Sequence, residues 1–168
     1  MSKNTEVHFS SASNEWETPP SLFEWISHIY RFTLDPCCTH GSAKCFYHFT
    51  VADDGLSKSW DRETVFMNPP YGNDIGKWVK KAYEESQNGG ATVVCLIPAR
   101  TDTSWWYEYC TKAARILFIT GRVHFIQGEK QAAAPFPSCF VVFQPDCHLC
   151  RCDWFKLGLD IRRGSLDK

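Results

Sequence analysis

The sequence predicts an α/β protein with one core and a mostly parallel sheet that ends in an antiparallel hairpin. Short apolar runs that read as strands alternate with amphipathic segments that read as helices, which is the order typical of parallel sheets. Two further strand-like runs follow, residues 123–126 and 138–144, and we expect them to pair with each other around the loop 127–137. Together these observations indicate a Rossmann-like architecture.

The length and composition are those of a single folded domain. The chain has 168 residues, of which 43% are hydrophobic and 22% charged. No apolar run approaches the roughly 20 residues of a membrane span, and the polar first residues carry no export signal. We therefore expect a cytoplasmic protein whose nine cysteines are reduced. The net charge of −1 excludes a globally basic nucleic-acid binder but leaves room for a local basic face.

The chain divides into a leader at 1–14, a main domain at 15–144 and an extension of that domain at 145–168, whose structure we leave open. Apolar residues at helical spacing predict helices over 21–31 and 73–88, and a third helix over about 105–114. The predicted strands are 32–35, 45–51, 65–67, 92–97 as a central parallel strand, and 116–120.

The most informative stretch is the apolar strand that ends in Asn68-Pro69-Pro70-Tyr71. Neither proline can donate to a sheet ladder, and each restricts the residue before it to extended conformations. The stretch therefore forms a stiff hook at the carboxyl end of a strand, where open α/β sheets place their ligands. A plain turn is the alternative interpretation.

Three other segments could complete a site around this hook. Thr18 precedes a predicted helix, either as its cap or as part of an anion site at the helix start. Asp35 ends a strand and begins a turn of small residues that reaches Gly41, a layout that suits a cofactor loop. Asp53 and Asp54 lie in a turn, where they either contact a ligand or only form the turn.

The hook suits methyl transfer to an adenine amine. The lone pair of that amine is delocalised into the ring, and two hydrogen-bond acceptors can localise it for attack. The Asn68 Oδ1 atom and the Pro69 carbonyl would be those acceptors, and Tyr71 could stack on the base. The methyl donor would be the sulfonium of S-adenosylmethionine, with catalysis by alignment and electrostatics and without a metal.

The wider series of motifs resembles a known family. It runs from Trp16-Glu17-Thr18-Pro19 through Leu34-Asp35-Pro36-Cys37, Asp54-Gly55-Leu56 with Trp60, the Asn-Pro-Pro-Tyr-Gly hook, Pro98-Ala99-Arg100-Thr101-Asp102-Thr103 with Trp105-Trp106, Gly121-Arg122 with Phe125, and Ala134-Pro135 to Pro137-Ser138. In this order the motifs resemble the small phage and prophage DNA N6-adenine methyltransferases, the phage Dam family. The resemblance covers about residues 15–143 and implies a class I methyltransferase fold that uses S-adenosylmethionine.

The resemblance also implies roles for individual residues. The implied catalytic residues are Asn68, Pro69, Pro70 and Tyr71. The implied cofactor-binding residues are Trp16, Thr18, Pro19, Asp35, Pro36, Cys37, Gly41, Asp53 or Asp54, and Asn68. The implied substrate-binding residues are Tyr71, Arg100, Asp102, Thr103, Arg122, Ser138, and Phe136 as a second aromatic wall opposite Tyr71.

Two departures from the family pattern matter. The cofactor turn carries Cys38-Thr39-His40 where small residues and glycine are usual, and the chain has no room for a separate target-recognition domain. The target would then be read by short loops, and its specificity would be weak or assisted by dimerisation. We expect a monomer or a weak dimer that acts on DNA in a bacterial host, encoded by a phage or prophage.

Other interpretations stay open at this point. The same hook could serve adenine in RNA or a glutamine amide in a protein, and a decayed enzyme could persist as a nucleic-acid-binding module. The cluster of Cys147, His148, Cys150 and Cys152 lacks a second half, so we predict reduced thiols rather than a metal site. A basic strip near the carboxyl edge of the sheet could bind DNA phosphates. Its residues would be Lys58, Arg62, Lys77, Lys80, Lys81, Arg100 and Arg122.

Overall fold

The computed structural model describes residues 16–128, 130–147 and 150–156, and within them the fold is built on one large sheet. Seven strands form this sheet in the order β2-β1-β3-β4-β8-β5-β9. All of them run in one direction except β8, which is antiparallel to both of its neighbours. The strands are β1 Leu34–Asp35, β2 Tyr47–His48, β3 Thr64–Met67, β4 Thr92–Pro98, β5 Arg115–Thr120, β8 Ser138–Phe143 and β9 Arg151–Lys156.

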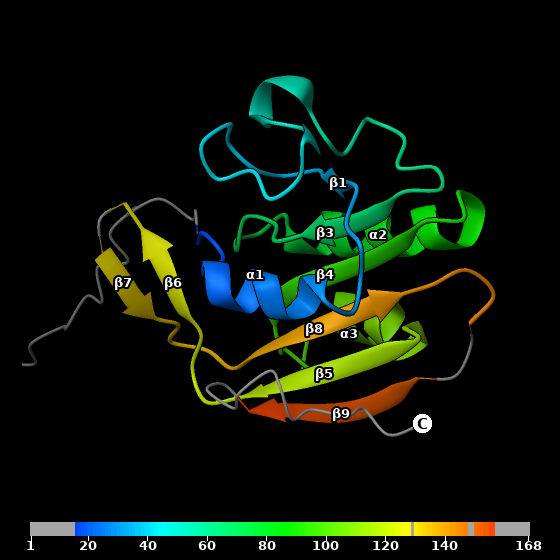
Figure 1. Cartoon of the computed structure of the whole chain (residues 1–168). Helices are drawn as coiled ribbons and strands as arrows, with labels where there is room; N and C mark the ends of the chain where they lie inside the picture. The colour runs from blue at the N-terminus through cyan, green and yellow to red at the C-terminus, as the bar shows by residue number, and fades with distance from the viewer. Residues whose placement is uncertain (1–15, 129, 148–149, 157–168) are drawn as a thin grey trace, which may run out of the picture.

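Helices cover both faces of the sheet (Figure 1). Helix α1, Pro20–Ser27, lies over one face, while α2, Ile75–Asn88, and α3, Ser104–Glu108, lie over the other. The apolar stripe of α2 is buried, while Lys77 and Lys80 face outward and Lys81 is partly buried, in line with the 3.6-residue period. The predicted mostly parallel α/β sheet is confirmed.

The centre of the sheet is the core. Strand β4 is buried from its second residue to its last, and β8 is buried along its whole length. Such strands lie between two covered faces, so they read as continuous apolar runs rather than alternating ones. Strand β9 extends the same sheet at its edge by pairing with β5 in parallel, which places described residues of the C-terminal extension on the main sheet.

The pairing predicted for the terminal hairpin is wrong. Strand β6, His124–Gln127, pairs with β7, Lys130–Ala133, in a separate ribbon that projects from the side of the sheet (Figure 1). The run at 138–143 inserts instead between β4 and β5. Its six buried residues need cover on both faces, which only the large sheet supplies. The turn of the ribbon starts at Gly128, whose φ of 61° favours glycine.

Several predicted elements are shorter than expected, and the strand at 32–35 reduces to β1. The first helix ends at Ser27 rather than at residue 31, and the residues just after it carry a mixture of i→i−3 and i→i−4 hydrogen bonds. The strand at 45–51 reduces to β2 and is followed by a 3₁₀ turn, η1 Val51–Asp53. The helix at 105–114 divides into α3 and a second 3₁₀ turn, η2 Cys110–Lys112. Among the described residues, no helix is long and apolar enough to span a membrane. The leader at 1–14 lies outside the described residues.

Candidate active site

A cavity of about 330 Å³ opens at the carboxyl edge of β1 and β3. Its walls come from residues 16–18, the loop after β1, the turn after η1, the hook after β3, and residues 126–128 of the ribbon. The strands β1, β3, β4 and β5 run in one direction, so their carboxyl ends share this edge, and the antiparallel β8 begins there. These lining segments therefore converge in space, although they are up to about 110 residues apart in sequence.

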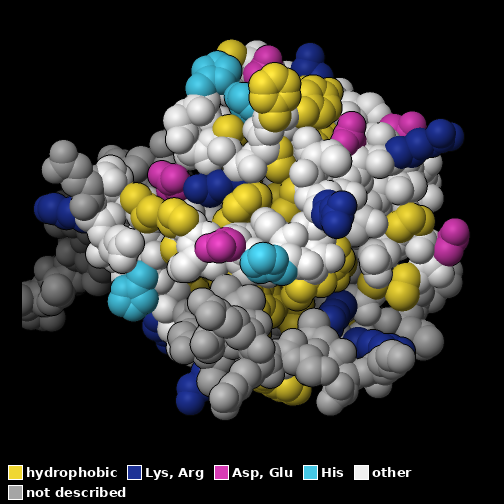
Figure 2. Space-filling model, in the orientation of Figure 1, with side chains coloured by type: hydrophobic (Ala, Val, Ile, Leu, Met, Phe, Trp, Pro, Cys, Tyr) yellow, Lys and Arg dark blue, Asp and Glu magenta, His cyan; other side chains and the backbone are white. Residues whose placement is uncertain are grey.

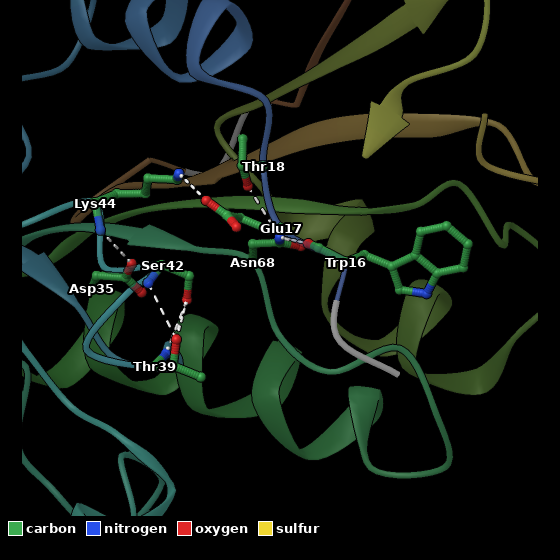
Figure 3. Close-up of polar contacts among 8 residues, drawn as sticks. All are labelled: Trp16, Glu17, Thr18, Asp35, Thr39, Ser42, Lys44 and Asn68. Atoms are coloured by element: carbon green, nitrogen blue, oxygen red, sulfur yellow. Dashed lines mark hydrogen bonds and ion pairs between the residues drawn. The ribbon is translucent and has the colours of Figure 1, made fainter. Parts of the chain in front are cut away.

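Asn68 is held by hydrogen bonds to the segment that precedes α1 in the sequence (Figure 3). Its Nδ2 atom donates one hydrogen bond to the Trp16 backbone carbonyl and another, of 3.0 Å, to the Thr18 hydroxyl. Its Oδ1 atom is buried and has no hydrogen-bond partner. A buried acceptor without a donor costs about 1–3 kcal/mol, and such groups mark places where a ligand completes the bonding.

Thr18 does not cap α1. The N-cap residue is Pro19, and no side chain caps the helix. The Thr18 side chain is buried, at 2% exposure, and lines the cavity. The capping alternative for Thr18 is therefore wrong, and Pro19 itself does not line the cavity.

Asp35 organises the loop after β1. Its Oδ2 atom accepts a hydrogen bond of 3.0 Å from the Lys44 amide, and Oδ1 accepts one of 3.4 Å from the Cys37 amide. Burial raises the pKa of this carboxyl, while the amides and Lys44 oppose the rise. The carboxylate thereby holds together the loop whose residues Pro36 and Cys37 line the cavity. Gly41, in the same loop, does not line it.

Burial disfavours ionisation of the two thiols at the start of this loop, Cys37 and Cys38. Burial raises the pKa of the Cys37 thiol well above its ordinary value, and the neighbouring Asp35 carboxylate raises it further. Burial first, and then Asp35, raise the pKa of Cys38 to about 12. Both thiols are therefore protonated at neutral pH, and a protonated thiol is a poor nucleophile.

The two adjacent acidic residues after β2 have different positions. Asp53 accepts hydrogen bonds of 2.8 Å from both the amide and the hydroxyl of Thr50, and these bonds lower the pKa of its carboxyl. It caps η1 and does not line the cavity. Asp54 does line the cavity, with a left-handed backbone φ of 52°. The structure therefore brings Asp54, and not Asp53, to the proposed ligand.

An ion pair between Glu17 and Lys44 also belongs to the cavity wall, and sequence reasoning missed it. The Lys44 Nζ atom lies 3.1 Å from Glu17 Oε1, and the Lys44 side chain is only 14% exposed. The Glu17 backbone pairs in addition with Ile126 of the ribbon, in both directions, at 3.1 and 3.0 Å. Local sequence patterns do not predict such contacts, because the two partners are far apart in sequence.

Tyr71 is buried and presents no open face for stacking. Its side chain is 8% exposed, and its hydroxyl donates a hydrogen bond of 3.0 Å to the Leu96 carbonyl. Its ring meets Phe125 and Phe136 edge to face, with centroids 5.8 and 5.4 Å away, and Trp16 contacts the same two rings. We call Trp16, Tyr71, Phe125 and Phe136 the aromatic cluster.

The predicted pair of walls, Tyr71 opposite Phe136, is not formed in this arrangement. A base that stacks between two rings needs the ring planes parallel, with room for the base between them. Here the two planes meet at 78° and the rings are in contact. In this arrangement the two rings leave no space for a base between them.

The remaining predicted substrate residues share the carboxyl edge but not the cavity. Arg100, Asp102 and Thr103 follow β4, and Arg122 follows β5; of these, both arginines and Asp102 are exposed. Ser138 begins β8 opposite Pro98, is 2% exposed, and has an unpartnered hydroxyl. Among the described residues, Ser138 Oγ and Asn68 Oδ1 are the two buried side-chain polar atoms without a partner.

The predicted basic strip is not continuous. Arg62 precedes β3 and bonds to the end of α2 through its backbone, so it lies at the amino edge, opposite Arg100. Lys77, Lys80 and Lys81 pair with acidic residues of α2 or of its first turn. On the face drawn in Figure 2, Lys and Arg side chains are scattered among acidic and uncharged ones. Arg100 follows β4, the neighbour of β3, and Arg122 follows β5, which ends at the same edge two strands further along the sheet.

The cysteine cluster near the C-terminus forms no metal site among the described residues, and His148 lies outside them. Burial, and then the neighbouring Cys152 thiol, raise the pKa of Cys150 to about 11.

Comparison with known proteins agrees with this geometry. Residues 6–145 match the family model described as DNA N-6-adenine-methyltransferase (Dam). The chain is 30% identical over 137 residues to the DNA N-6-adenine-methyltransferase of Haemophilus phage HP1 (strain HP1c1), covering 77% of this chain and 78% of that protein. It is 28% identical over 132 residues to the protein of the same description from Escherichia phage T1, covering 68% and 54% respectively. The chain belongs to the Dam family of DNA N-6-adenine-methyltransferases.

Proposed function

We propose that this protein transfers a methyl group from S-adenosylmethionine to the N6 amine of adenine in DNA, and that Asn68 is its central catalytic residue. The observation that carries the proposal is the buried, unpartnered Asn68 Oδ1 in a hook of the sequence Asn-Pro-Pro-Tyr. Family membership supports the reaction.

The adenine amine would donate its two hydrogens to Asn68 Oδ1 and to the Pro69 carbonyl. Two acceptors on one side of the ring plane draw the amine hydrogens out of that plane, which makes the nitrogen pyramidal and localises its lone pair on the opposite side. The Asn68 oxygen is already aligned before the base arrives, so little reorganisation is needed at the moment of reaction. After transfer the extra proton leaves to water, and we assign no general base.

The cavity fits S-adenosylmethionine in size and chemistry. Its volume of about 330 Å³ lies within the range of small-molecule sites, roughly 300–1,000 Å³. When bound, this cosubstrate supplies an electrophilic methyl group on a sulfonium. On the chain side, Asp54 offers a carboxylate for hydroxyl or amine donors, and Lys44 and Glu17 offer charges of both signs. The other proposed contacts are Trp16, Thr18, Pro36 and Cys37.

The side of the site that would receive the base is closed by the aromatic cluster. We propose that DNA binding displaces Phe136, which frees a face of Tyr71 and exposes Asn68 Oδ1. Phe136 is partly exposed and lies in the segment between the ribbon and β8, so it can move without unfolding a strand. Ser138 lies two residues after Phe136 in the sequence, and its hydroxyl has no partner. This hydroxyl would then form a hydrogen bond with the incoming base.

Several finer points belong to the same proposal. We propose that the target is short or loosely defined and is read from Arg100, Asp102, Thr103 and Arg122. We also propose a monomer or weak dimer in the cytoplasm of a bacterial host, phage or prophage encoded, and a main domain at 15–144 that the segment 145–168 extends. Pairing of β9 with β5 supports that extension.

The test is transfer of a labelled methyl group to unmethylated DNA. The wild type should label adenine N6, and Asn68→Ala should lower kcat at least about 100-fold, because a transition-state acceptor is lost. Asn88→Ala, an exposed amide at the far end of α2, is the matched control and should match the wild type. RNA and a glutamine peptide are offered in parallel. If RNA or the glutamine peptide is labelled in preference to DNA, that acceptor is the substrate and the proposal is wrong. If no acceptor is labelled, the protein is a non-catalytic nucleic-acid-binding module.

A further inference from the structure

The Asn68 side chain has a defined orientation, and backbone chemistry sets it. A carboxamide can turn over and exchange its oxygen and nitrogen, since its last torsion is broad. A backbone carbonyl, however, can only accept hydrogen bonds. The carbonyl of Trp16 therefore requires the Nδ2 side of Asn68 to face it, and Oδ1 must point the other way.

One carbonyl satisfies only one of the two amide hydrogens. The second goes to the Thr18 hydroxyl, at 3.0 Å. Thr18 is buried, so water cannot easily replace this acceptor. Without the hydroxyl, one N–H of Asn68 would lack a partner, and the amide could rotate toward other orientations in which Oδ1 no longer meets the target amine.

The segment that carries these two acceptors is fixed from two sides. Between Trp16 and Thr18, the Glu17 backbone pairs in both directions with Ile126 of the ribbon. The Glu17 carboxylate is held by Lys44, whose own backbone amide bonds to Asp35 (Figure 3). The acceptors of the Asn68 amide thus sit on an extended segment tied to both the ribbon and the loop after β1.

We propose that Thr18 is a positioning residue that orients the Asn68 carboxamide, so that Oδ1 is presented to the target amine. Its hydroxyl acts on the reaction through Asn68 rather than by contact with the methyl donor alone. This inference rests on the proposed function, because it assigns Oδ1 to the amine acceptor. The bond to Asn68 also accounts for the Thr18 hydroxyl, which precedes α1 in the sequence but does not cap that helix.

The test compares Thr18→Val, which keeps the shape and removes the acceptor, with Thr18→Ser, which keeps the acceptor. We expect Thr18→Val to lower kcat about 10-fold or more, equivalent to about 1.4 kcal/mol. The Kd for S-adenosylmethionine should change by a smaller factor, because valine keeps the shape of the cavity wall. Thr18→Ser should restore most of kcat. The control is Thr111→Val, which removes a 2.7 Å hydroxyl bond to Tyr107 in an exposed segment outside the cavity wall.

A second measurement needs no activity. Thermal unfolding of Thr18→Val, Asn68→Ala and the double variant forms a double-mutant cycle. If the hydrogen bond exists, the two losses in Tm are less than additive, and Thr111→Val combined with Asn68→Ala is additive.

The outcomes separate the hypotheses. A Thr18→Val variant that binds S-adenosylmethionine weakly but keeps its kcat would overturn the positioning role and leave the proposed function intact. Additive losses in Tm would overturn the hydrogen bond itself. A wild type that labels no acceptor would defeat the proposed function, and the unfolding cycle would still decide whether Thr18 holds Asn68.

Discussion

The hydroxyl of Tyr71, a member of the aromatic cluster, donates a hydrogen bond of 3.0 Å to the backbone carbonyl of Leu96. The last residue of the hook is thus anchored to the central strand β4. Tyr71→Phe should lower the free energy of unfolding by about 1 kcal/mol, because one buried hydrogen bond is lost. Tyr71→Ala should cost about 3–5 kcal/mol, since it also empties the ring volume.

Urea unfolding measures both Tyr71 variants. Tyr107→Phe is the control, because Tyr107 is 77% exposed. Its unfolding free energy should equal that of the wild type, and an equal loss in Tyr107→Phe and Tyr71→Phe would contradict the anchoring role.

Ser138 separates function from stability. Its hydroxyl is buried without a partner, so Ser138→Ala should leave the unfolding free energy unchanged or raise it slightly. Methyl transfer should nevertheless fall, because the hydroxyl is proposed to bond to the base. Ser86→Ala is the matched control: that buried hydroxyl donates to the Tyr83 carbonyl at 2.7 Å, and its loss should cost about 1 kcal/mol of stability without altering activity. Full methyl-transfer activity in Ser138→Ala would show that the Ser138 hydroxyl does not bind the base.

Gly55 is required by a close approach of two loops. A Cβ atom there would lie 2.0 Å from the Pro36 carbonyl oxygen, so one loop of the cavity wall must shift. We expect Gly55→Ala to lose about 1–3 kcal/mol of stability and to bind S-adenosylmethionine less tightly, by calorimetry. In Gly41→Ala the new Cβ would meet nothing nearer than 4.0 Å, so affinity and stability should match the wild type. A larger effect at Gly41 than at Gly55 would place the ligand elsewhere.

The buried Asp35 carboxyl makes stability depend on pH. Its folded pKa is raised above 3.8, mainly by burial, so between 3.8 and the raised value the folded state binds more protons than the unfolded state. The contribution of Asp35 to stability is therefore full below 3.8 and falls as pH rises through the folded pKa. Asp35→Asn removes this titration but also one of two acceptors for the loop amides.

The free energy of unfolding of wild type minus that of Asp35→Asn should thus decrease from pH 3.5 to pH 7, as followed by urea titration. A difference that grows with pH would mean that the carboxylate is stabilised rather than destabilised by its surroundings.

The edge on which DNA lies can be found from salt dependence. Arg100→Gln and Arg122→Gln should each reduce the slope of log K against log salt by about 0.9, the contribution of one phosphate contact. Arg62→Gln changes the same charge at the opposite edge of the sheet and should leave the slope unchanged. Fluorescence anisotropy with a short duplex measures all three. Equal effects of the three substitutions would point to a diffuse field rather than a defined face.

Much of the fold could be predicted from the sequence because it depends on local patterns. The apolar runs of β3 and β4 and the periodic face of α2 are properties of neighbouring residues, and each appears where expected. The partner of β8 could not be predicted this way. An apolar run predicts that a strand is buried, but it does not predict which strands it pairs with. Contacts distant in sequence decide that β8 inserts between β4 and β5 rather than pairing with β6.

The sequence by itself determined the hook, its place at the end of a strand, and the segments at Thr18, Asp35 and Asp54 that line the cavity, because prolines, turns and strand ends act locally. Only the tertiary structure decided that Asp54 rather than Asp53 lines the cavity and that Tyr71 is buried. It also decided that the Asn68 oxygen is the unpaired end of the amide, because its partners Trp16 and Thr18 lie 52 and 50 residues away. A residue's type supplies the donors and acceptors, and folding decides which of them remain for a substrate.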